Sequence, residues 1–402
     1  MPFPAVNNWF EALEQLQSFI VQTKNRGKKV IFMDELSWLD TQKSGFVQAL
    51  EYFWNSFASA RKDIVLIVCA SATSWLINKI IKNKGGLHNR VTQQIALQPF
   101  TLSETELFLK SRKIECNRKQ IIEYYMVMGG VPFYLEFIKK SKSVAQNIDS
   151  MFFAENAPFK DEFFLLYNSL FQHSGKHIAV INALSTKKKG LTREEILKLL
   201  AIPDGGSVSR ILEELEQCGF IRVYNDYRQQ SKNRIYQLVD FYSLFYLNFI
   251  ADEKQLPENY WTSRIDNPKH RAWSGYSFEQ VCMAHVRQIK NKLGISGVTT
   301  KVYSWRSRDA INRVSTENGA QIDLIIKRND KITNLCEIKF SNKEFVIDKK
   351  QDEALRNKKY TFIEETGSRD AVHLTMITTY GVKRNAYWGN IQSEITMNDL
   401  FV

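Results

Sequence analysis

Two adjacent acidic residues, Asp34 and Glu35, directly follow a run of four apolar residues in the segment KKVIFMDELSWLD. Such a run predicts a short, fully buried strand that delivers both carboxylates at its C-terminal end. In phosphate-handling α/β proteins the first acid of such a pair holds Mg²⁺ and the second orients water. Those sites also need a glycine-rich loop with a lysine, and the sequence contains no G-x-x-x-x-G-K-[ST] motif. The sequence therefore predicts the metal-binding half of a nucleotide site without its phosphate-binding half.

A second group of charged residues lies in the segment GAQIDLIIKRNDKITNLCEIKFS. Two strand-like runs flank the polar RNDK, which predicts a β-hairpin. With the turn centred on Asp330, Asp323 lies directly opposite Glu337, and their β-carbons would be about 5 Å apart. Like charges so placed destabilise a sheet unless they are neutralised, and a divalent cation does this well. Lys339 follows Glu337 by two residues and so shares its face, where it would contact a scissile phosphate or position a water.

The D-(x13)-E-x-K spacing of this hairpin resembles the signature of PD-(D/E)xK nucleases, in which the acids bind Mg²⁺ and the lysine assists hydrolysis. Glu279, in the helix-like WSGYSFEQVCMAHVRQI, is a possible further metal-binding carboxylate. The alternative is an exposed hairpin whose acids and lysine form ordinary ion pairs. The strand pair and the upstream helix favour a nuclease-like fold, whereas a working nuclease is a separate and weaker claim.

The elements around Asp34 and Glu35 follow a regular order. The apolar pattern predicts a helix over residues 8–25, a strand at 29–34, a helix near 42–59 and a second buried strand at 63–71. Helices alternating with continuous apolar strands predict a parallel sheet covered on both faces. Ligands bind at the C-terminal ends of such strands, and the residues expected there are Asp34, Glu35, Ser71 and Thr73.

The middle of the chain is predominantly helical. Residues 103 to about 170 predict helices with a break at GGVP (129–132), and residues 176–240 predict three short helices and a strand pair, as in a winged helix-turn-helix. Thr192 and Glu195 form a capping box at the second of these helices. Acids on the would-be recognition helix, SVSRILEELEQ, repel phosphates, so packing or protein interaction is favoured there over DNA binding. The polar DEKQLPENYW (252–261) is a candidate linker.

Composition limits the classes of protein to consider. A chain of 402 residues is long enough for two to four domains. The five cysteines show no C-x-x-C spacing, which favours a reducing cytoplasm over a zinc ribbon or a disulfide framework. No apolar run approaches the roughly 20 residues of a membrane helix. The net charge of +12 suits an anionic partner such as DNA, or solubility alone. The basic groups that stand out are Lys187 to Lys189, Arg306 with Arg308, and Lys349 with Lys350.

The order of these segments resembles the archaeal-type P-loop ATPases, close to the AAA and STAND branches, whose C-terminal region is a PD-(D/E)xK-nuclease-like domain. The resemblance rests on VIFMDELSWLD, CASATSWLINKII, GGLHNRVTQQIALQPFTLSE, MGGVPFYL, the winged-helix pattern and the hairpin. It implies an α/β fold in four parts: an incomplete P-loop NTPase parallel sheet at 1–102, a helical lid at 103–172, a winged helix at 173–250 and a restriction-endonuclease-like α/β domain at 262–402.

The resemblance also implies roles for single residues. Asp34 would coordinate Mg²⁺, Glu35 would polarise the attacking water and Ser71 would take the sensor position near the γ-phosphate of ATP. Arg90 in HNR is a candidate phosphate-sensing arginine. Each has a plainer alternative: Asp34 as a helix cap, Ser71 as a small residue at a strand end and Arg90 as a surface arginine. The cofactors implied are ATP and Mg²⁺.

The chain departs from this family at its start. Family members begin with a strand, a glycine-rich loop with Lys-Thr or Lys-Ser, and a helix, all before the segment that begins here. We therefore expect a fragment, with the P-loop lost by truncation or supplied by a separate segment or by self-association. Without P-loop amides and lysine, the chain alone is expected to bind ATP poorly and to hydrolyse none.

Three functions remain open from the sequence. The first is an ATP-binding protein of this ATPase family, with a nuclease-like domain attached. The second is a Mg²⁺-dependent DNA endonuclease whose other domains only position the substrate. The third is a non-enzymatic regulatory or interaction remnant.

Overall fold

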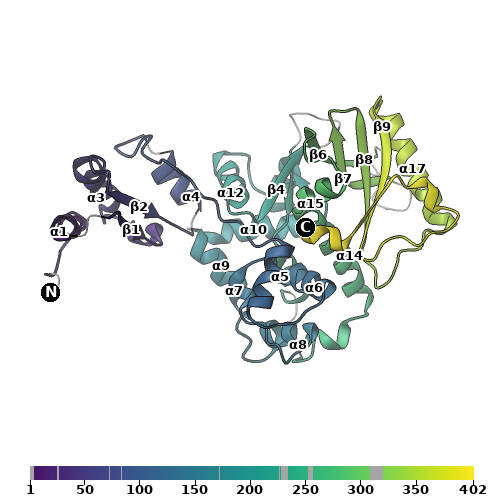
Figure 1. Cartoon of the computed structure of the whole chain (residues 1–402), viewed down its shortest axis with the longest axis horizontal. Coiled ribbons are helices and arrows are strands. Elements are labelled where there is room, and N and C mark those ends of the chain that lie inside the picture. The colour runs from purple at the N-terminus through teal and green to yellow at the C-terminus, as the bar shows by residue number, and fades with distance from the viewer. Residues whose placement is uncertain are drawn as a thin grey trace. The chain divides into compact units, whose positions relative to one another are not determined.

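A computed structural model describes residues 4–24, 27–71, 73–82, 84–171, 173–225, 227, 234–251, 257–307 and 320–402. The chain divides into two compact units, both of mixed helix and strand (Figure 1). The first unit consists of Met1–Leu97, Leu165–His177 and Gly205–Cys218, and the second of Gln98–Phe164, Ile178–Asp204 and Gly219–Val402. Within the described residues, no helix is both long enough and apolar enough to traverse a bilayer.

A two-stranded parallel sheet forms the centre of the first unit. Helix α1 (Trp9–Gln22) leads to β1 (Lys29–Met33), and α3 (Phe46–Phe53), with its π-helical extension Trp54–Ala58, leads to β2 (Ile64–Val68). The two strands pair in parallel, with Ile31 opposite Leu66. The predicted helix–strand–helix–strand order is thus confirmed. Short helices α2 (Leu36–Leu39) and α4 (Thr73–Leu76) follow the two strands.

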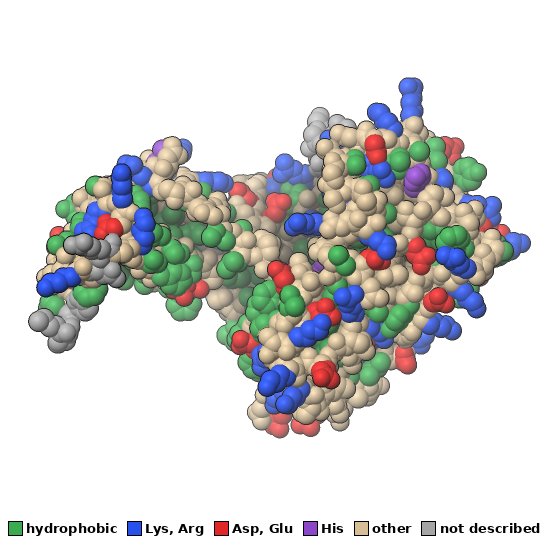
Figure 2. Space-filling model, in the orientation of Figure 1, with side chains coloured by type: hydrophobic (Ala, Val, Ile, Leu, Met, Phe, Trp, Pro, Cys, Tyr) green, Lys and Arg blue, Asp and Glu red, His purple; other side chains and the backbone are tan. Residues whose placement is uncertain are grey.

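In the described structure only one face of this sheet is covered. Side chains alternate along a strand, and Ile31 and Met33 pack with residues of α1 and α3. Their neighbours Val30 and Phe32 point the other way and are each 61% exposed, and the same face includes the exposed Val65 and Ile67 of β2. The prediction of a fully buried strand covered on both faces is therefore wrong here, because the two long helices pack on the same side. Figure 2 shows hydrophobic side chains gathered at the surface of this unit.

The second unit begins with helices. They are α5 (Leu102–Ser111), α6 (Arg118–Met128), α7 (Pro132–Leu135), and α8 (Val144–Ile148) with its π-helical extension Asp149–Phe153. The break predicted at GGVP is confirmed. Gly129 ends α6 with φ of 62°, and a Cβ on Gly130 would lie 1.8 Å from the backbone oxygen of Phe100, so both positions require glycine.

The elements of the predicted winged helix are present. Helix α11 (Arg193–Leu200) starts at the predicted capping box, and β3 (Leu191–Thr192), β4 (Ile221–Asn225) and β5 (Arg234–Leu238) form an antiparallel sheet in the order β3-β5-β4. Helix α10 (Ser174–Ser185) crosses from one unit to the other, and α12 (Gly206–Gln217), the would-be recognition helix, belongs to the first unit. Their assembly into a winged helix therefore stays a prediction.

The C-terminal part of the second unit contains a five-stranded mixed sheet in the order β10-β9-β8-β7-β6. Its elements, with the helices around them, are α13 (Phe241–Phe249), α14 (Pro268–Ala284), α15 (Val286–Lys292), β6 (Thr300–Arg306), β7 (Gln321–Arg328), β8 (Ile332–Lys339), α17 (Lys349–Thr366), β9 (Ala371–Thr378) and β10 (Ser393–Thr396). Strands β6, β7 and β8 are antiparallel, whereas β8, β9 and β10 are parallel. Helix α17 lies along β9 (Figure 1).

The β7–β8 hairpin has the register that the sequence predicts. Leu324 pairs with Cys336 and Ile325 with Leu335, so the same register places Asp323 opposite Glu337. Lys331 takes φ of 65° at the turn. A core that includes Ile325, Leu335 and Phe362 of α17 fixes the hairpin in the sheet.

The C-terminal part of the predicted linker is a packed segment. Residues 252–256 lie outside the described residues, but Tyr260 and Trp261 are buried. The buried carboxylate of Asp149 accepts hydrogen bonds from the backbone N–H groups of Trp261 and Thr262, at 2.7 and 3.0 Å. A charged acceptor bound to two backbone donors holds this segment against the helices of the second unit.

Candidate functional site

The first candidate site lies at the carboxyl ends of β1 and β2. Asp34 is exposed, and its Oδ1 accepts hydrogen bonds from the backbone N–H of Glu35 at 3.0 Å and from the thiol of Cys69. Glu35 Oε2 accepts from the hydroxyl of Ser71 at 2.7 Å. The structure thus brings together Asp34, Glu35 and Ser71. The hydrogen bond to Asp34, with burial, raises the pKa of the Cys69 thiol, so this group stays a neutral donor.

The backbone of Glu35 is strained. Its φ of 51° and ψ of 50° place it in the left-handed region, which costs a non-glycine residue about 1–2 kcal/mol. It occupies the N-cap position of α2, yet its side chain makes no capping hydrogen bond and reaches Ser71 instead. The alternative in which Asp34 only caps the next helix is wrong, since the N-cap position is that of Glu35. Strain of this kind gathers at functional sites.

The two remaining residues predicted for this edge are less well placed. Arg90 is exposed and follows a turn in which its backbone N–H bonds to Leu87. Within the described ranges, no hydrogen bond or ion pair joins its side chain to Asp34, Glu35 or Ser71. The side chain of Thr73 lies outside what the structure describes, as does all of Arg308 in the predicted basic groups.

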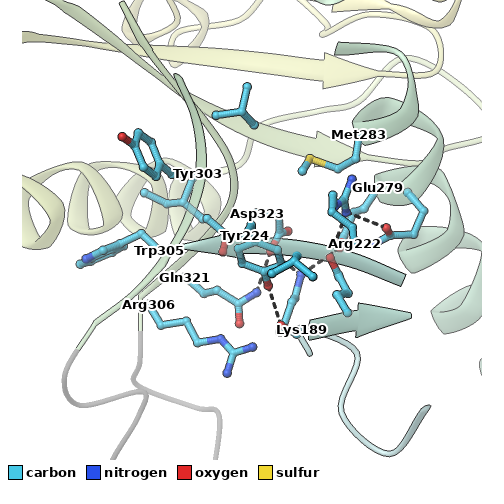
Figure 3. Close-up of a pocket in the computed structure, with 16 residues that line it drawn as sticks. Lys189, Arg222, Tyr224, Glu279, Met283, Tyr303, Trp305, Arg306, Gln321 and Asp323 are labelled. Atoms are coloured by element: carbon cyan, nitrogen blue, oxygen red, sulfur yellow. Dashed lines mark hydrogen bonds and ion pairs between the residues drawn. The ribbon is translucent and has the colours of Figure 1, made fainter. Parts of the chain in front are cut away.

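The second candidate site is a group of carboxylates and lysines in the second unit (Figure 3). Lys189, in the loop before β3, places its Nζ 2.9 Å from Glu279 Oε2 on α14. The same ammonium bonds to Asp323 Oδ1 on β7. Gln321 Nε2 donates to the same Asp323 oxygen at 2.6 Å. Segments far apart in the sequence therefore meet at one ammonium group.

Glu337 on β8 is neutralised separately. Its Oε1 lies 2.9 Å from Lys339 Nζ and its Oε2 lies 2.7 Å from Lys358 Nζ on α17. The three carboxylates of this unit that were predicted as metal ligands thus have lysine partners, whereas the fourth, Asp34 in the first unit, has none among the described residues. In the part of the chain that the structure describes, no three His, Cys, Asp or Glu side chains are grouped closely enough to hold a metal ion.

Burial and charge set the protonation of this cluster. Burial, reinforced by the charge of Asp323, raises the pKa of Glu279 to about 7. Burial also acts to raise the pKa of Asp323, but the charge and hydrogen bond of Lys189 outweigh it and lower that pKa. The pKa of Lys189 is raised against burial by both carboxylates. The ammonium and Asp323 are therefore both charged at neutral pH, and Glu279 is the carboxylate nearest to exchanging its proton.

The chemistry of Glu279 and Asp323 fits a hard divalent cation. Their oxygens converge on one positively charged atom, and Mg²⁺ is often held by one or two carboxylates with water and substrate phosphate as the remaining ligands. The lysine ammonium stands in that position, so a cation would have to displace it. Glu337 and Lys339 lie on the neighbouring strand of the same hairpin.

A cavity of about 190 Å³ opens beside Lys189, Glu279 and Asp323. Its walls come from β4, β5, β6, β7 and α14, and they include Tyr224 and Arg222 (Figure 3). Arg222 donates to the side-chain oxygens of Gln237 and Gln280, at 2.9 and 3.0 Å, and its buried Nε has no hydrogen-bond partner among the residues that the structure describes. This pocket combines half-buried cationic side chains, aromatic walls and the acidic pair.

Sequence reasoning missed Lys189 and Lys358 as members of the cluster. Lys189 belongs to a predicted basic run, but nothing in its spacing joins it to Glu279 or Asp323, which are 90 and 134 residues away. Lys358 is one of several lysines on α17. Only the fold brings these residues to the hairpin.

Comparison with models of protein families finds no match, and comparison with curated protein sequences finds none either. Among solved structures, the chain is similar to a Walker-type ATPase of Pyrococcus abyssi, with a TM-score of 0.39 and 14% sequence identity. The similarity covers 59% of this chain and 66% of that one, slightly under two thirds of its length. A TM-score this low supports no argument about fold or function.

Proposed function

We propose that the first unit provides the metal-binding and water-orienting half of an ATP site, as in an ATPase-like protein. The observation that carries the proposal is the bond from Ser71 to Glu35 across the carboxyl ends of two parallel strands, with Asp34 beside them. Ligands of parallel sheets bind at this edge. The strained backbone of Glu35 supports a functional role, since its side chain is turned away from capping and toward Ser71.

Each side chain has a distinct role in this proposal. Asp34 would hold Mg²⁺ with the nucleotide, and the cation would neutralise charge on the phosphate oxygens. Glu35, oriented by Ser71, would align a water molecule. A protein segment that bears a phosphate-binding loop would cover the open apolar face of β1 and β2. Alone, the half-site binds nucleotide weakly, because it lacks phosphate contacts from such a loop.

Titration of the full chain with a fluorescent ATP analogue, with and without Mg²⁺, tests this proposal. We expect weak, saturable, Mg²⁺-dependent binding that Asp34→Asn abolishes. Asp63→Asn is the matched control, because Asp63 lies at the opposite end of the same sheet and pairs with Lys29 and Arg61. Binding that survives Asp34→Asn, or that is lost equally in the control, would contradict the assignment.

A second candidate function, Mg²⁺-dependent cleavage of a phosphodiester, belongs to the second unit. It is favoured by the β7–β8 register, which places Asp323 opposite Glu337, and by the adjoining cavity. Glu279 and Asp323 would hold the cation, which would offset charge on the phosphate. Lys339, on the same strand as Glu337, would contact the phosphate or orient water.

Incubation of the full chain with plasmid DNA and Mg²⁺ or Mn²⁺ tests this second candidate. We expect nicking that Asp323→Asn and Lys339→Ala each remove. Asp330→Asn is the matched control, because Asp330 lies in the turn at the far end of the same hairpin and bonds to Arg328. Equal cleavage by wild type and Asp323→Asn would assign any nicking to another source.

A further inference from the structure

The loop that carries Lys189 is anchored by its own backbone. The carbonyl oxygen of Lys188 accepts hydrogen bonds from Gln237 Nε2 at 2.8 Å and from the hydroxyl of Tyr276 at 2.7 Å. The carbonyl of Lys189 accepts from the hydroxyl of Tyr224 at 2.6 Å. A Cβ on Gly190, whose φ is 82°, would lie 2.5 Å from the backbone oxygen of Tyr236, so only glycine fits there. The loop is therefore fixed by β4, β5 and α14.

This anchoring fixes where the Lys189 ammonium can reach. The fixed backbone directs the Lys189 side chain between α14 and β7, where its Nζ meets both Glu279 and Asp323 (Figure 3). The next lysine in the chain behaves differently. Lys188 Nζ lies over the ring of Tyr276, 5.2 Å from its centre, and donates to the backbone oxygen of Ala272. Of these two adjacent lysines, only Lys189 contacts both Glu279 and Asp323 in the described structure.

Carboxylates partly removed from water are stabilised by a counter-charge, and here one ammonium pairs with two half-buried carboxylates. Lysine is a compact point charge on a flexible four-carbon stem, so it can leave the pair while its backbone stays bound. A divalent cation placed between the same oxygens would repel it. The ammonium and the cation are therefore alternatives for one position.

We propose that Lys189 is a built-in competitor for the divalent cation of the second unit, occupying the Glu279–Asp323 position until the cation displaces it. The proposal rests on the second candidate function. It adds that the cation would bind by displacing the Lys189 ammonium. Because the two cations exclude each other, Lys189 lowers the affinity for the metal and stabilises the metal-free fold.

Mn²⁺ binding to the full chain, followed by calorimetry and by the resonance signal of free Mn²⁺, tests the competition. We expect Lys189→Met to bind Mn²⁺ about tenfold more tightly than wild type, within the usual range of such couplings. Lys188→Met removes the same charge from the same loop, but Lys188 contacts Ala272 and Tyr276 and not the acidic pair, so Mn²⁺ affinity should change much less than in Lys189→Met. Lys189→Gln, which can still donate to a carboxylate, replaces the methionine variant if that protein does not fold.

A second readout separates competition from a purely structural role. Thermal unfolding should show Lys189→Met less stable than wild type without metal and rescued by Mn²⁺ to a larger degree than wild type is. Unchanged or weaker Mn²⁺ affinity in both Lys189 variants, with cleavage of DNA by wild type intact, would overturn the competition alone. Tighter binding without any cleavage would overturn the phosphodiesterase candidate and leave the competition standing. Absence of Mn²⁺ binding in every variant would overturn both.

Discussion

The two units present carboxylates in opposite environments. Asp34 is exposed at the end of a sheet of two strands, where water can solvate its charge. Glu279, Asp323 and Glu337 surround a hairpin inside a five-stranded sheet, and each is bound by a lysine. A solvated acid needs no fixed partner, whereas a half-buried acid is stabilised by a nearby positive charge or by protonation. The lysines of the second unit thus balance the negative charge of its half-buried carboxylates. The exposed Asp34 of the first unit is solvated by water instead.

The sheets that support the two sites differ in the same way. Strand β7 is covered on both faces, and Ile326 is fully buried. Strand β2 is covered on one face only, and Ile67 is 45% exposed on the other. The second unit therefore positions its site by its own packing. The described part of the first unit leaves apolar area of its sheet in contact with water.

The largest expected effect is the difference in unfolding free energy between alanine substitutions of these two isoleucines. Ile326→Ala removes fully buried methyl groups and should destabilise the second unit by about 2–5 kcal/mol. Ile67→Ala should cost about 1 kcal/mol or less, because much of that side chain is already in water. Amide hydrogen exchange read separately over β7 and β2 measures both. A loss of several kcal/mol at Ile67 would show that the open face is covered in solution.

A smaller effect compares the two leading acids. Asp323→Ala removes an acceptor from Lys189 and should cost about 2 kcal/mol, in the range of hydrogen bonds to charged groups. Asp34→Ala should change stability by no more than about 0.5 kcal/mol, as for most surface substitutions. Urea unfolding with the same exchange readout separates the units. Equal costs at the two positions would remove the distinction between a buried and a solvated site.

The sequence was informative where local pattern decides the outcome. The hairpin register followed from the turn at Asp330, and the break at Gly129 and Gly130 from glycine itself. The meeting of Glu35 with Ser71 followed from the rule that parallel strands end at one edge. In each case the cause lies within a few residues or in one pair of strands.

The sequence pattern could not predict which face of the β1–β2 sheet is covered. It also could not predict which lysine pairs with which carboxylate. Val30 and Phe32 are as apolar as buried strand residues, and their exposure depends on both α1 and α3 packing on the other side of the sheet. Lys189 lies in a run of three lysines, and only the hydrogen bonds to the Lys188 and Lys189 carbonyls select it for the acidic pair. Such outcomes depend on tertiary contacts, which spacing along one chain does not encode.

The smallest expected effect is the difference in stability lost when the hydroxyl group that orients each site is removed. Tyr224→Phe removes the donor to the Lys189 carbonyl and should cost about 1 kcal/mol, the usual net value of a protein hydrogen bond. Ser71→Ala removes a donor to Glu35, which water can replace at an exposed edge, so we expect about 0.5 kcal/mol or less. Hydrogen exchange over residues 187–192 and 34–39 reports each loss. If Ser71→Ala cost more than Tyr224→Phe, the Glu35 conformation would depend on Ser71 for its stability, and the first site would be as rigidly built as the second.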